Sequence, residues 1–111
     1  MSLRHYETMF VLKPTLTDEE KEKNIENIKN VITQNGGEVA ALDKIGVREL
    51  AYPINKFERG DYNIIYYKAP ASAVLELERQ MRYNEDILRF MTVKYENKKE
   101  IKRWEEMVKN V

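Results

Sequence analysis

The chain has 111 residues, no cysteine and one histidine, and its 19 lysines and arginines equal its 19 aspartates and glutamates. The length fits one ordinary domain, the missing thiols exclude disulfides and thiolate metal sites, and a single histidine argues against a histidine-based metal site or a Ser-His-Asp triad. Because the charge is balanced, any case for nucleic acid depends on where the cations lie. We therefore expect no catalytic residue, no metal and no cofactor.

The first residues carry charge and a strand-like pattern, without the apolar run of a secretory signal. No apolar stretch approaches the length of a membrane span. We expect a cytoplasmic protein with neither a membrane partner nor a small-molecule substrate.

Residues 4–13 are rich in aromatic and β-branched types and end at Pro14, which predicts a strand. Alternation directs one set of side chains toward the core, namely Tyr6, Thr8, Phe10 and Leu12. The opposite face carries His5, Glu7, Met9, Val11 and Lys13. Since both faces carry apolar residues, we expect this strand to be central in its sheet.

Two helices are predicted between strands. Thr17 and Glu20 form a capping-box pattern and residues 35–37 a glycine stop, so a helix should lie between them. Its buried stripe is Ile25, Ile28, Val31 and Ile32. Residues 71–83 form the second helix, with Ser72 as the amino-terminal cap. Its apolar side is expected to comprise Val74, Leu75, Leu77, Met81 and Tyr83.

The other strands are bounded by prolines, glycines and turns. The second has a bulge or bend at residues 43–46 and lies at a sheet edge, because Pro53 cannot donate to a ladder. A turn over residues 55–61 separates it from the third strand. The predicted strand segments are 38–42, 47–54, 62–68 and 87–95.

The resulting order, βαββαβ, predicts an α+β ferredoxin-like fold, with a four-stranded antiparallel sheet and two helices on one face. Right-handed crossovers place the first and third strands in the middle. Nothing in this pattern covers the other face of the sheet. We expect an exposed apolar patch there that serves as a contact surface, formed by Met9, Val11, Met91 and Val93.

We assign residues 1–95 to the ferredoxin-like domain and residues 96–111 to a tail. The tail has an amphipathic helical pattern whose apolar side is Ile101, Trp104, Met107 and Val108. A helix this short needs a surface to lie on. That surface could belong to its own domain, to a partner or to a second copy.

Several cations lie on strands or on the hairpin. The ordinary interpretation of each is solvation or edge protection. As a set, Arg4, Arg89 and Lys94 on neighbouring strands predict positive charge concentrated on one side of the sheet, as phosphate binding requires.

Two other functions have weaker support. Arg59-Gly60-Asp61 matches the third-strand motif of RNA-recognition domains only in its basic–glycine pair, so base stacking on the sheet is not expected. An acylphosphatase-like enzyme needs a phosphate-cradling loop after the first strand, and residues 13–17 contain no glycine. The main alternative is a ferredoxin-like homodimer or regulatory binding module without RNA.

Three segments, Arg4–Glu7, Gly46–Ile54 and Leu88–Lys94, together resemble the bacterial ribosomal protein S-six family of the small (30S) subunit. The most specific is Arg-Glu-Leu-Ala-Tyr-Pro-Ile within Gly46–Ile54. The resemblance spans about residues 3 to 95. It implies a non-catalytic structural constituent of the small ribosomal subunit that binds the central domain of 16S ribosomal RNA together with ribosomal protein S-eighteen.

The resemblance also implies site residues. The RNA-binding positions are Arg4, Arg89, Lys94, Arg48 and Lys56. Our own hypothesis is that the protein partner contacts the open sheet face and the second-strand edge, at Met9, Val11, Met91, Val93, Glu49 and Tyr52. At two positions where family members can carry a basic residue, this chain does not. His5, after Arg4, is mostly neutral, and Glu49, after Arg48, is acidic.

Overall fold

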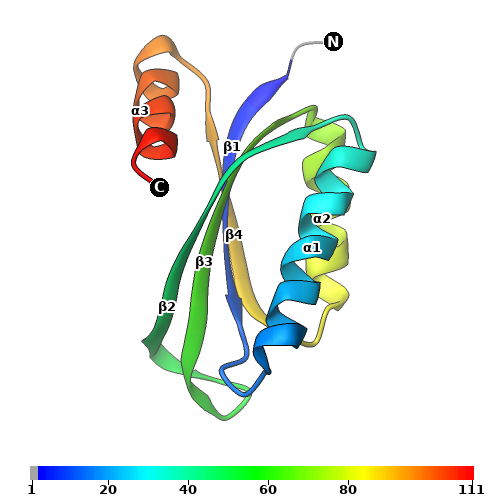
Figure 1. The fold of residues 1–111 in the computed structure, drawn as a ribbon, viewed down its shortest axis with the longest axis vertical. Helices are drawn as coiled ribbons and strands as arrows, with labels where there is room; N and C mark the ends of the chain where they lie inside the picture. The colour runs from blue at the N-terminus through cyan, green and yellow to red at the C-terminus, as the bar shows by residue number, and fades with distance from the viewer. Residues whose placement is uncertain (1–2) are drawn as a thin grey trace.

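The computed structural model describes residues 3–111, and it has the expected α+β ferredoxin-like architecture (Figure 1). Four antiparallel strands form one sheet in the order β2-β3-β1-β4, so β1 and β3 are central, as the crossover rule requires. Helices α1 and α2 cover one face. The elements are β1 Arg4–Leu12, α1 Asp18–Gln34, β2 Glu38–Ile54, β3 Phe57–Ala69, α2 Ala71–Tyr83, β4 Ile87–Tyr95 and α3 Lys98–Lys109.

The core lies between the sheet and the two helices. Alternation along β1 is confirmed, since its predicted core residues are buried, namely Tyr6, Thr8, Phe10 and Leu12. The Thr8 hydroxyl in that row is satisfied, because it hydrogen bonds to the Tyr67 hydroxyl at 2.8 Å and to the Thr92 hydroxyl at 2.9 Å. Burying the Thr8 hydroxyl therefore costs little free energy of folding.

Helix α1 begins and ends as its sequence predicts. The Thr17 hydroxyl accepts from the Glu20 amide and the Glu20 carboxylate accepts from the Thr17 amide, so both halves of the capping box form. The helix ends before Gly36, whose φ of 87° is a left-handed conformation that glycine adopts without strain. The expected stripe from Ile25 to Ile32 is buried.

The hairpin between β2 and β3 is tighter than the predicted turn over residues 55–61. The turn consists of Asn55 and Lys56 alone, with φ of 49° and 70°, and β3 already begins at Phe57. Two left-handed residues match the right-handed twist of the flanking strands, which allows both strands to continue to the tip. The expected bulge near residues 43–46 is confirmed, since the register shifts between Lys44 and Gly46.

Two details of α2 were predicted wrongly. Pro70 occupies the position before the helix, and no side chain caps it, so Ser72 is not the cap. Leu75 and Tyr83 are 71% and 75% exposed. The buried stripe follows the spacing i, i+3, i+7 through Val74, Leu77 and Met81. Leu75 and Tyr83 lie outside this stripe.

Helix α3 packs on the face of the sheet opposite α1 and α2 (Figure 1). Trp104 is buried there against Tyr66 and Tyr95, and its indole N–H donates to the Tyr6 carbonyl at 2.9 Å. The expectation that nothing in the chain covers this face is therefore wrong in part. The tail uses its own domain as the surface that its apolar side requires.

Candidate functional site

The open face of the sheet, which α1 and α2 do not cover, is organised in rows by the strand register. Directly paired residues of antiparallel strands project to the same side. One row joins Arg89, Val11 and Tyr62, and the next joins Met91, Met9 and Ile64. The row nearest α3 joins Val93, Glu7 and Tyr66. The expected patch and one expected cation, Arg89, thus share this face.

Val11 does not belong to the exposed patch, because it is fully buried. Gly60 of β3 lies against it, since a Cβ placed on Gly60 would be 2.2 Å from Val11 Cγ1, and the Leu50 side chain of β2 is 3.4 Å from the same Cβ position. The twisted β2–β3 hairpin brings its own residues over this end of the sheet. Val11 is therefore a packing residue and not a surface for a partner.

The rest of the apolar patch is accessible. Met9 is half-buried, whereas Met91 and Val93 on the edge strand β4 are 51% and 38% exposed. Helix α3 covers the neighbouring part of the face, where Met107 and Val108 pack near Ala41 and Ile64. We call Met9, Met91 and Val93 the β4 strip. It is an apolar surface between the α3 helix and the outer edge of the sheet.

The other two expected partner residues, Glu49 and Tyr52, lie in one groove on the hairpin. Between the pairs Glu49–Arg59 and Ile54–Phe57, residues 50–53 of β2 face only Glu58 of β3, so the edge strand bulges outward. Pro53 lacks the amide that a regular ladder would need. The groove has a volume of about 330 Å³ and is lined by Glu49, Leu50, Ala51, Tyr52, Pro53, Glu58 and Arg59.

The expected RNA-binding cations do not gather on one side of the sheet. Lys94 pairs with Tyr6 and so projects to the face of α1 and α2, near the start of β1 where Arg4 is exposed. Arg89 pairs with Val11 toward the opposite end and on the open face. The prediction of one concentrated patch is wrong, because a separation of five residues along a strand changes both the end and the face.

The hairpin cations lie toward the end of the sheet that carries Arg89. Arg48 is exposed and pairs with Gly60 across the hairpin, while Lys56 is exposed in the turn itself. Lys94, at the other end, is ion-paired with Glu96 at 2.7 Å. The structure thus divides the five cations between the two ends of the sheet, with Arg4 and Lys94 at one end and Arg89, Arg48 and Lys56 toward the other.

His5 has a role that the sequence did not indicate. Its ring meets the indole of Trp104 edge-on, with centroids 4.7 Å apart. Burial, and next the nearby Lys68 ammonium, lower the pKa of His5, while Glu105 acts in the opposite direction. His5 is thus a neutral packing residue beneath α3. The apolar spacing of the tail was a signal for this contact, but it did not say which strand residues would receive it.

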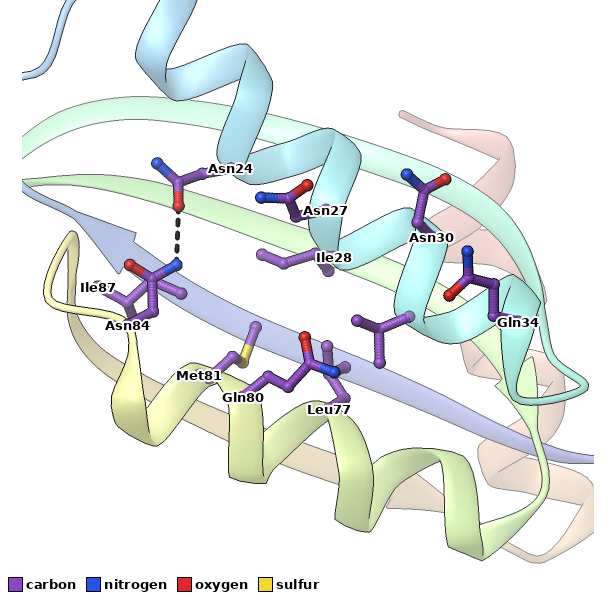
Figure 2. Close-up of a pocket in the computed structure, with 11 residues that line it drawn as sticks. Asn24, Asn27, Ile28, Asn30, Gln34, Leu77, Gln80, Met81, Asn84 and Ile87 are labelled. Atoms are coloured by element: carbon purple, nitrogen blue, oxygen red, sulfur yellow. Dashed lines mark hydrogen bonds between the residues drawn. The ribbon is translucent and has the colours of Figure 1, made fainter.

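A second groove lies between α1 and α2, on the other side of the molecule (Figure 2). Its floor is apolar, and Asn24 donates to the Asp86 carboxylate and accepts from the Asn84 side chain, which ties α1 to the start of β4. No lining residue carries a charge. Carboxamides form the rim, namely Asn24, Asn27, Asn30, Gln34, Gln80 and Asn84. This groove lacks the cations that a phosphate site needs.

Two further observations concern residues 3–111. Their His, Asp and Glu side chains form no group of three or more that could hold a metal ion. None of their helices has the length and apolar character needed to cross a membrane.

Comparisons with known proteins identify the family. The family model described as Ribosomal protein S6 matches residues 5–94. The "Small ribosomal subunit protein bS6" of a Nitratiruptor species is 63% identical over 106 residues, which cover 96% of this chain and 83% of that protein. The protein of the same name from Campylobacter concisus is 53% identical over 109 residues, which cover 98% and 78%.

A solved structure agrees with the sequence comparisons. The crystal structure of 30S ribosomal protein S6 from Thermotoga maritima matches with a TM-score of 0.81 at 30% identity, covering 96% of this chain and 98% of that one. The chain therefore belongs to the Ribosomal protein S6 family and is a non-catalytic structural protein of the small ribosomal subunit.

Proposed function

We propose that the protein binds the central domain of 16S ribosomal RNA together with ribosomal protein S-eighteen, in the cytoplasmic ribosome. The observation that carries this proposal is the β4 strip, an exposed apolar surface on a protein that has no net charge. A protein without net charge gains little binding energy from neutralising phosphates. A basic partner that covers the strip would supply the positive charge that RNA binding needs.

The proposal divides the surface between two partners. The partner protein covers Met9, Met91 and Val93 and enters the hairpin groove at Glu49 and Tyr52. The cations contact phosphates, with Arg4 and Lys94 at one end of the sheet and Arg89, Arg48 and Lys56 toward the other. Charges on both sides of an apolar contact suit a protein held between RNA segments.

The experiment measures binding of a central-domain RNA fragment to this protein with and without S-eighteen. We expect binding to need S-eighteen and to weaken with salt. Val93→Glu should abolish the protein–protein contact, because a buried carboxylate without a partner is costly. Leu75→Glu, at an exposed leucine on α2, is the matched control and should bind normally.

Two results contradict the proposal. One is tight, salt-insensitive RNA binding by the protein alone. The other is a stable homodimer that buries the β4 strip, detected by sedimentation and abolished by Val93→Glu, which would support the binding-module alternative.

A further inference from the structure

A pocket of about 280 Å³ lies where β1 begins, β4 ends and α3 begins. Three separate segments build it. Its volume is close to the lower limit of about 300 Å³ for small-ligand sites, so it suits a single ring system. The lining residues are Leu3, Arg4, His5, Tyr95, Glu96 and Ile101.

The aromatic and aliphatic side chains that line this pocket are held in place by the fold. The Tyr95 ring is buried and its hydroxyl donates to the Glu7 carboxylate. The His5 ring is held by its contact with Trp104. Ile101, from the first turns of α3, is half-buried, and Leu3 is 38% exposed at the entrance. Because these contacts fix the side chains before a ligand binds, little conformational entropy is lost when a ring binds between them.

The rim carries both kinds of polar group. Arg4 is exposed and offers a guanidinium to an anion. The Glu96 carboxylate is held by the Lys94 ammonium, and 64% of its side chain remains exposed. Because Lys94 compensates the charge of Glu96, the carboxylate does not repel a phosphate at Arg4 as strongly as a free one would. It can still accept a hydrogen bond from an amino group.

We propose that this pocket accepts one unstacked nucleobase of an RNA strand, with the adjoining phosphate at Arg4. The inference rests on the proposed function and names a recognition element within it. Proteins read single-stranded RNA by placing splayed bases against aromatic side chains and hydrogen bonding to their edges. Glu96 accepts from an exocyclic amino group, so adenine, cytosine and guanine bind better than uracil. Helix α3 supplies one wall through Ile101.

The test uses the full chain and nucleoside monophosphates, followed by NMR. AMP, CMP and GMP should shift the signals of residues 3–5, 95, 96 and 101, UMP should do so more weakly, and inorganic phosphate should affect only the surroundings of Arg4. Leu3→Trp places a much larger side chain in the lining and should lower the affinity at least about tenfold, because it occupies the space that the base needs. Leu75→Trp makes the same change at an exposed site on α2 and should have no effect.

Equal shifts with inorganic phosphate and with AMP would show an anion contact only and overturn the base pocket. Unchanged AMP affinity in Leu3→Trp would overturn it as well, and equal affinity for UMP and CMP would remove the role of Glu96. The nucleotide titration needs neither S-eighteen nor ribosomal RNA. If the assembly with both fails to form while nucleotides still bind, the proposed function fails alone. If Leu3→Trp leaves that assembly unchanged, the pocket inference fails alone.

Discussion

Gly60 and Val11 approach so closely that the position on β3 has no room for a side chain, since a Cβ on Gly60 would lie 2.2 Å from Val11 Cγ1. This contact closes one end of the open face. It also removes Val11 from the surface that a partner can reach.

Gly60→Ala should destabilise the protein by about 1–3 kcal/mol, because the added methyl group overpacks this contact. Urea unfolding measures the loss. The double variant Gly60→Ala with Val11→Ala should regain part of it, since the second change removes the atoms in conflict. An additive effect of the two changes would show that the steric account is wrong.

Tyr67→Phe should cost about 1 kcal/mol, because it removes the hydroxyl that hydrogen bonds to the buried Thr8 side chain. Burial raises the pKa of Tyr67 to about 12, so this hydroxyl stays protonated at ordinary pH. Tyr52→Phe, at a 60% exposed tyrosine, is the matched control and should change stability by less than about 0.5 kcal/mol. Equal losses of stability for the two variants in chemical denaturation would show that the buried hydrogen bond between Thr8 and Tyr67 does not stabilise the fold.

Lowering the pH should destabilise the docking of α3 through His5. The folded protein holds the pKa of His5 below its ordinary value, so the unfolded chain takes up its proton first as the pH falls. The stability is complete above about pH 6.5 and is lost from there down to the folded pKa. Unfolding followed by the fluorescence of Trp104, at about pH 7.5 and 5.5, measures the change. His5→Gln should flatten this dependence, and an unchanged slope would assign it to other groups.

Removal of residues 96–111 should leave the ferredoxin-like domain folded, because the main core lies between the sheet and α1 and α2. The truncated chain lacks Trp104, so Tyr66 and Tyr95 become exposed. The free energy of unfolding should fall by about 3 kcal/mol. Circular dichroism and urea unfolding test both points. A chain that no longer unfolds cooperatively would show that residues 1–95 are not an independent domain.

Arg4→Ala should weaken RNA binding in the assembly and reduce the slope of log affinity against log salt by about 1, as expected for one lost phosphate contact. Arg79→Ala is the control, because it removes an exposed arginine that pairs with Glu76 on α2, a helix that carries none of the proposed RNA-binding residues. Both variants remove one arginine charge, and they differ only in where that charge lies on the protein. Identical salt slopes for both would mean that Arg4 does not contact phosphate.

The order of elements, the central placement of β1 and both ends of α1 could be predicted because local patterns determine them. Side chains alternate along a strand, a threonine and a glutamate three residues apart cap a helix, and crossover handedness restricts the sheet order. The shared face of Arg89, Met91 and Val93 also followed from alternation alone. These features depend on neighbours in sequence or on a rule that applies to all chains.

The tertiary structure decided the features that depend on distant segments. The sequence by itself predicted an amphipathic helix within residues 96–111, but only packing shows that Trp104 contacts His5 and Tyr66, and so that α3 covers part of the open face. Val11 looked exposed because alternation assigns a face, whereas burial depends on what approaches that face. The hairpin twist brings Gly60 there. Alternation alone puts Arg89 and Lys94 on opposite faces of β4, whereas only the sheet register places Lys94 beside the start of β1, where Arg4 lies.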